Sequence, residues 1–122
     1  MPRASDRAFE DWAAVETFAL TLPDVEPGTS YGKPAVKMRG KMIASTTAPS
    51  GDSFVLSVTL PEKELLLDTV PDSFWETDHY RGWPAMLVRY GSDAGERIAM
   101  LLTRAWWDRA TVAQRKAYGD RP

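Results

Sequence analysis

The chain has 122 residues, of which 43% are hydrophobic and 26% are charged, and its formal net charge is −2. This length is typical of one domain with one hydrophobic core, and the composition is that of a folded protein rather than a disordered one. The slightly negative charge excludes an overall attraction to nucleic acid or to an anionic membrane, so such binding would need a local cationic surface. We therefore expect a single domain over residues 1–122, with a short tail from about residue 111.

Residue types that carry catalysis or bind metals are scarce. The sequence has no cysteine and one histidine, His79, which excludes disulfides, thiolate zinc sites and histidine pairs within the chain. No G-x-S-x-G motif occurs, and the segment Gly28–Lys33 lacks the full spacing of a phosphate-binding loop. We predict a non-enzymatic protein that needs no metal and no cofactor.

The sequence also carries no membrane or export signal that we can identify. Its longest apolar run, Ile98–Leu102, falls far short of the roughly 20 residues that cross a bilayer. The first residues, Met1–Asp6, lack the apolar stretch of a secretory signal. Together with the absence of cysteine, these features predict a cytoplasmic location and no membrane partner.

The first predicted element is a helix over Asp6–Thr21. Asp6 is suited to an N-cap, and Pro23 ends the pattern. Apolar residues recur at helical spacing between them: Trp12, Val15, Phe18, Ala19 and Leu22. The next segment, Pro23–Ser30, contains two prolines and a glycine, so we predict a loop there.

A β-hairpin is predicted next. The runs Ala35–Met38 and Lys41–Thr46 are separated by Arg39 and Gly40, and glycine supplies the positive φ that tight hairpin turns require.

Two registers are open for this hairpin. A two-residue turn places Met38 opposite Lys41, whereas a three-residue loop places Met38 opposite Met42 and Val36 opposite Ala44. We prefer the second register because it gathers the apolar side chains on one face of the hairpin.

The second half of the chain supplies five shorter elements and one long helix. The shorter elements are, in order, a half-buried strand at Phe54–Leu60, a helix at Pro61–Thr69, a short strand at Ser73–Thr77, a turn at Asp78–Gly82 and a strand at Ala85–Tyr90. The long helix begins at Gly91–Asp93. Five apolar residues lie on one of its faces: Ile98, Leu101, Leu102, Ala105 and Trp106. Helix-forming residues continue over Thr111–Tyr118, and we expect Gly119–Pro122 to fray.

This order of elements predicts an α+β fold. Consecutive strands joined by short turns cannot be parallel, so we expect a compact sandwich in which an antiparallel sheet of about four to five strands packs against helices.

Three stretches stand out together in content and order: Leu20–Val25, Tyr31–Ala44 and Arg81–Trp83. In these stretches the chain resembles the MmcQ/YjbR family, and the similarity runs over nearly its whole length. The resemblance implies a compact α/β sandwich with an antiparallel sheet, and a DNA-binding function attributed to wing-like hairpins. The chain departs from the family's commoner pattern at Pro84, where we expect a weakened or shifted strand edge, and in the tail that follows Trp107.

The residues 31–45 form what we call the cationic hairpin. No acidic residue occurs between Glu26 and Asp52, and this interval contains four cations: Lys33, Lys37, Arg39 and Lys41. One interpretation is that these side chains contact the phosphates of DNA. The alternative is that solvent-facing lysines protect a sheet edge from aggregation.

A different class of function is a binding module for a small molecule or a protein partner. Aromatic residues with polar tips are common in such sites, and five are candidates: Tyr31, His79, Tyr80, Trp83 and Trp107. In the DNA-binding interpretation, Tyr31, Tyr80 or Trp83 would stack on exposed bases. The alternative is that most of these rings belong to the core of a small domain, as we expect for Trp106.

Overall fold

Six antiparallel strands form one sheet in the described part of the chain, residues 9–48 and 51–122 of the computed structural model. The strands lie in the order β1-β2-β3-β4-β6-β5. Their bounds are β1 (Val25–Ser30), β2 (Lys33–Met38), β3 (Lys41–Ser45), β4 (Ser53–Ser57), β5 (Phe74–Trp75) and β6 (Ala85–Arg89). The helices are α1 (Trp12–Ala19), α2 (Leu60–Thr69), α3 (Gly95–Arg109) and α4 (Val112–Tyr118), with a 3₁₀ turn η2 at Asp78–Tyr80.

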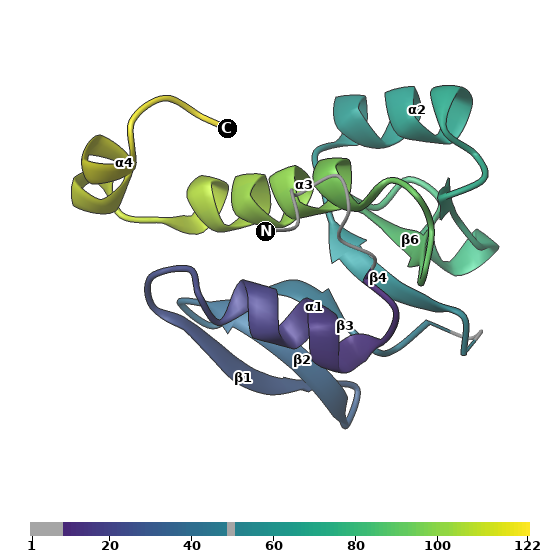
Figure 1. Cartoon of the computed structure of the whole chain (residues 1–122), viewed down its shortest axis with the longest axis horizontal. Coiled ribbons are helices and arrows are strands. Elements are labelled where there is room, and N and C mark those ends of the chain that lie inside the picture. The colour runs from purple at the N-terminus through teal and green to yellow at the C-terminus, as the bar shows by residue number, and fades with distance from the viewer. Residues whose placement is uncertain (1–8, 49–50) are drawn as a thin grey trace.

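The predicted α+β class is confirmed. Figure 1 shows α3 running across the molecule above α1 and the β1–β3 end of the sheet, with α2 near β6 and α4 beyond the end of α3. Within the described residues, no helix combines the length and the apolar composition needed to cross a membrane.

The prediction of a loop over Pro23–Ser30 was wrong, because β1 occupies most of this segment. β1 is an edge strand, where the missing N–H of Pro27 is tolerated. Gly28 leaves room for a neighbour, since a Cβ built on it would lie 3.2 Å from Cδ of Lys37. Two successive positive-φ residues, Tyr31 at 51° and Gly32 at 74°, then make the tight turn into β2.

The cationic hairpin combines the two registers. Met38 pairs with Lys41 across a two-residue turn, in which Arg39 and Gly40 have φ of 53° and 80°. The register then shifts, and Val36 pairs with Ala44 as in the three-residue alternative. A β-bulge allows both pairings to occur on the same hairpin, because it adds one residue to a single strand.

Several predicted boundaries were also wrong. α1 begins at Trp12, with Asp11 Oδ1 accepting from the backbone N–H of Ala14 at 2.9 Å, whereas Asp6 lies outside the described residues. The strand predicted over Phe54–Leu60 ends at Ser57, and Leu60 already belongs to α2.

β4 is buried throughout rather than half-buried, because it is a central strand with both faces covered. α3 begins at Gly95, after a turn at Gly91. Pro84 precedes β6 directly and its carbonyl accepts from Val58 N–H at 3.0 Å, but it has no N–H to donate in return, and the paired residues of β6 begin at Ala85.

The C-terminal tail is also more ordered than we predicted. Thr111 and Gln114 form a capping box at the start of α4, which satisfies the first free N–H groups of that helix. Beyond α4, Arg121 pairs with Asp108 at 2.8 Å and with Glu62 at 2.8 Å. These contacts hold the last residues against α2 and α3.

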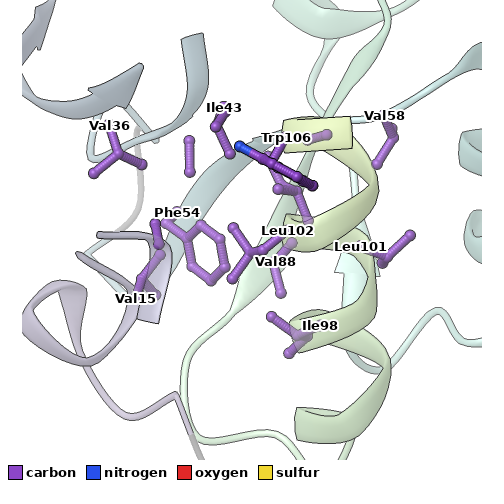
Figure 2. Packing of buried hydrophobic residues seen from close by; sticks show 14 of the residues in the cluster. Val15, Val36, Ile43, Phe54, Val58, Val88, Ile98, Leu101, Leu102 and Trp106 are labelled. Carbon is purple, nitrogen blue, oxygen red and sulfur yellow. The ribbon is translucent and has the colours of Figure 1, made fainter. Parts of the chain in front are cut away.

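The hydrophobic core lies between one face of the sheet and the helices α1 and α3. Figure 2 shows Phe54 of β4 among Val15 of α1 and Leu102 of α3. Trp106 is buried in the same cluster, as predicted, and its Nε1–H donates to Pro23 O at 2.7 Å. This bond satisfies the one polar atom of the indole, as burial requires.

The opposite face of the sheet carries small polar and apolar side chains. Leu56 pairs with Met86 and both belong to the core, so their neighbours Ser57 and Ala85, which also pair with each other, point away from it. The candidate site lies on this second face of the sheet.

The turn geometry of the cationic hairpin predicts a specific cost. Gly40→Ala places a Cβ on a residue with φ of 80°, so we expect a loss of about 1–2 kcal/mol in the free energy of unfolding, measured by urea denaturation. Gly51→Ala is the control, because Gly51 has open space around it and no positive φ. Equal stability of the two variants would contradict the turn described above.

Candidate functional site

A hollow with a volume of about 460 Å³ lies over this second face of the sheet, where Ser57 and Ala85 line it, and we call it the aromatic hollow. Four of the aromatic candidates line it: Tyr31, His79, Tyr80 and Trp83. They come from segments that are far apart in the sequence, the β1–β2 turn and the connection between β5 and β6. The aromatic hollow is also lined by Met42, Thr47, Ser57, Ala85 and Arg109. Its volume is in the range typical of small-molecule sites.

The connection that carries three of the aromatic residues is a series of tight turns, which we call the aromatic loop (residues 77–84). Tyr80 N–H donates to Thr77 O and Trp83 N–H donates to Tyr80 O, each at 3.0 Å. Gly82 takes a positive φ of 79°, which favours glycine at this position. The backbone therefore projects His79, Tyr80 and Trp83 from consecutive turns.

A buried lysine fixes the aromatic loop to α2. Lys63 is 3% exposed, and its Nζ donates to Tyr80 O at 2.6 Å and to Trp83 O at 2.9 Å. The same ammonium group lies 2.7 Å from Glu76 Oε2. One cation thus satisfies two backbone carbonyls and one carboxylate, which is the kind of partnering that a buried charge requires.

A short chain of hydroxyl groups positions the Tyr80 ring over the sheet. Ser45 Oγ lies 2.8 Å from Thr47 Oγ1, and Thr47 Oγ1 lies 3.4 Å from the Tyr80 hydroxyl. The His79 ring packs edge-on against Tyr80 with centroids 4.8 Å apart. The two rings form one wall of the aromatic hollow.

Tyr31, His79 and Trp83 are exposed, whereas Tyr80 is half-buried. Tyr31 is 84% exposed and Trp83 is 64% exposed, which argues against a role in the core. A second hollow of about 390 Å³ shares Tyr31, His79 and Tyr80 with the first and adds Lys33 and Thr77. The two hollows therefore adjoin, and they share the rings of Tyr31, His79 and Tyr80.

Arg109 brings a cation to the aromatic hollow. It is the last residue of α3, and its Nη1 donates to Ala105 O at 2.9 Å. Its Nε is enclosed and has no hydrogen-bond partner in the part of the chain that the structure describes. Burial lowers the pKa of the Arg109 guanidinium, and the charge of the neighbouring Asp108 opposes this lowering.

The cations of the cationic hairpin are spread along it. Lys33 begins β2 and Arg39 follows its end, so their backbones are about 20 Å apart at about 3.3 Å per residue. Arg39 lies in the turn and Lys41 follows it, and both are exposed, whereas Lys37 is half-buried. Lys37 also pairs in register with Glu26 of β1, so an acidic residue stands beside it.

Trp107 does not line the aromatic hollow. Its ring stacks under the guanidinium of Arg115, with 4.5 Å from Cζ to the ring centroid, and its Nε1 donates to Gly119 O. It therefore links α3 to the C-terminal tail.

Sequence reasoning missed the two cations that organise the site, Lys63 and Arg109. Each interrupts an apolar face of its helix: Lys63 lies three residues before buried Leu66, and Arg109 lies four residues after buried Ala105. A charged residue at a helix position that the pattern otherwise fills with apolar residues was the signal that could have identified them.

No protein-family model matches the sequence, and no curated protein matches it. Among solved structures, the chain is similar to the crystal structure of Deinococcus radiodurans protein DR2400, a DUF419 domain. The two chains are 17% identical with a TM-score of 0.66, and the match covers 89% of this chain and 88% of the other. At this identity the likeness shows the α+β fold alone.

The role of Lys63 in holding the aromatic loop can be tested by Lys63→Met. This variant leaves Glu76 and two carbonyls without their cation, so we expect a loss of about 3 kcal/mol in the free energy of unfolding. We also expect faster hydrogen exchange at the backbone amides of Arg81 and Trp83, which bond within the loop. The double variant Lys63→Met/Glu76→Gln should recover part of the stability. A loss no larger than the roughly 0.5 kcal/mol of a surface substitution would contradict this role.

Proposed function

We propose that the chain is a non-enzymatic binding module whose ligand is a small aromatic molecule held in the aromatic hollow. The single observation that carries this proposal is that Tyr31, His79, Tyr80 and Trp83 line one cavity. Aromatic side chains around a concave surface with a few polar groups are typical of small-molecule sites. Exposed rings also suit stacking on a planar ligand, because offset stacking of aromatic groups is favourable.

The construction of the site supports the proposal. Tyr31 and Trp83 expose most of their surface to solvent, although burying such rings in the core would stabilise the domain. Meanwhile, Lys63 and the hydroxyls of Ser45 and Thr47 hold the loop that carries the neighbouring rings. A site whose rings are held in place loses less conformational entropy when a ligand binds.

A titration with N-phenyl-1-naphthylamine, an uncharged aromatic dye that fluoresces in apolar surroundings, tests the proposal. We expect saturable binding to the native protein. Trp83→Ala or Tyr80→Ala should weaken it about five- to tenfold, because each removes one stacking surface.

Tyr118→Ala is the matched control, since Tyr118 is a half-exposed tyrosine on α4 that lies outside the aromatic hollow. Lack of saturable binding, or equal affinity in all four proteins, would overturn the proposal.

DNA binding through the cationic hairpin is a second candidate function. The exposed cations Arg39 and Lys41 lie in and directly after the tight turn at the end of the hairpin, as a wing would require. The three stretches that resemble the MmcQ/YjbR family support membership of that family. The fold is also similar to that of a DUF419 domain, and DUF419 is related to the MmcQ/YjbR superfamily.

The salt dependence of duplex DNA binding tests this candidate. Four phosphate contacts give a slope of about −3.6 in a plot of log affinity against log salt concentration, and Arg39→Glu/Lys41→Glu should reduce its magnitude by about 1.8. Arg97→Glu/Lys116→Glu changes the net charge equally at exposed sites outside the hairpin and serves as the control. No binding at about 50 mM salt would exclude the candidate, since electrostatic contacts are strongest at low salt.

A further inference from the structure

The charge at Arg109 is the least compensated feature of the aromatic hollow. A guanidinium carries five N–H donors, and among the described residues this one makes a single hydrogen bond, from Nη1 to Ala105 O. Its Nε–H donates to no group in the described residues. Buried donors and charges of this kind are ordinarily matched by an acceptor, preferably an anionic one.

The nearest carboxylates are already engaged by other arginines. Asp108 and Glu62 share with Arg109 a smaller hollow of about 210 Å³ beside the first. Asp108 accepts two hydrogen bonds from Arg121, at 2.8 and 2.9 Å, and Glu62 pairs with Arg121 and Arg104. Within the described ranges 9–48 and 51–122, no carboxylate lies within ion-pair distance of Arg109.

The position of Arg109 at the end of α3 explains only in part why a half-buried cation lies there. A cation in the last turn interacts favourably with the helix dipole, and the bond to Ala105 O satisfies one terminal carbonyl. An exposed arginine would provide both effects without desolvation. Arg109 instead lines the aromatic hollow with Met42 and Ala85, in apolar surroundings that strengthen its attraction for an anion.

We infer that Arg109 is the anion anchor of the aromatic hollow, so that the ligand is an aromatic compound bearing a carboxylate, sulfonate or phosphate group. This inference rests on the proposed function. The exposed rings hold the planar part of the ligand, and the guanidinium donates charge-assisted hydrogen bonds to its anionic group. The uncompensated arginine therefore selects anionic over neutral ligands of the same shape.

Two dyes that differ in one group separate this inference from the proposed function. 8-Anilinonaphthalene-1-sulfonate carries the ring system of N-phenyl-1-naphthylamine with one added sulfonate. We expect the native protein to bind the sulfonate about tenfold more tightly, the effect of a charge-assisted hydrogen bond. Arg109→Leu should abolish this preference, so that the variant binds the two dyes with equal affinity.

The control is Arg97→Leu, which removes the same charge from an exposed position of the same helix, about 18 Å away at 1.5 Å per residue. Equal binding of both dyes by the native protein would overturn the inference and leave the proposed function standing. Binding of neither dye would overturn both.

A second measurement needs no variant. The side-chain Nε–H resonance of Arg109 should shift on titration with the sulfonate dye and stay in place with the neutral dye. A preference for the sulfonate without this shift would place the anion elsewhere and contradict the assignment to Arg109.

Discussion

The arrangement of the site depends on the buried ammonium group of Lys63. From α2, it donates to the carbonyls of Tyr80 and Trp83 and also forms an ion pair with Glu76. Without a cation at this position, Glu76 would lose its ion-pair partner, and the two carbonyls would keep only the hydrogen bonds that they accept from Trp83 N–H and Ala85 N–H, at a cost of several kcal/mol. No residue of the aromatic loop is fully buried, so this polar anchor contributes strongly to where its rings lie.

The sheet supplies the second half of the site because its two faces differ. One face carries the side chains that pack against α1 and α3, including Phe54 and Leu56. The other carries Ser45, Ser57 and Ala85 together with the larger Val55 and Leu87, and Ser57 and Ala85 line the aromatic hollow. Alternation along β4 and β6 therefore fills the core and forms the floor of the aromatic hollow at the same time.

Local signals in the sequence were sufficient for most of the fold. The hairpin at Arg39 and Gly40, the apolar face of α3 and the antiparallel class follow from periodicity and turn chemistry, and the structure confirms them. β1 was missed because Pro27 and Gly28 are typical of loops, and only its position at the sheet edge makes them acceptable. The candidate aromatic residues were identified from residue type. Their convergence depends on Lys63, whose contacts with distant backbone carbonyls leave no periodic pattern.

Arg121 and Arg109 both lie near Asp108, but Arg121 is paired with carboxylates and Arg109 is not. Arg121 saturates its guanidinium with Asp108 and Glu62, and these hydrogen bonds raise its pKa, so it acts as a tether for the C-terminal tail. Both carboxylates pair with Arg121, and within the described residues neither forms an ion pair with Arg109, although the charge of Asp108 still acts on it. A local cation therefore lines the aromatic hollow, even though the chain as a whole is slightly acidic. Local pairing, rather than net charge, determines which kind of ligand this surface attracts.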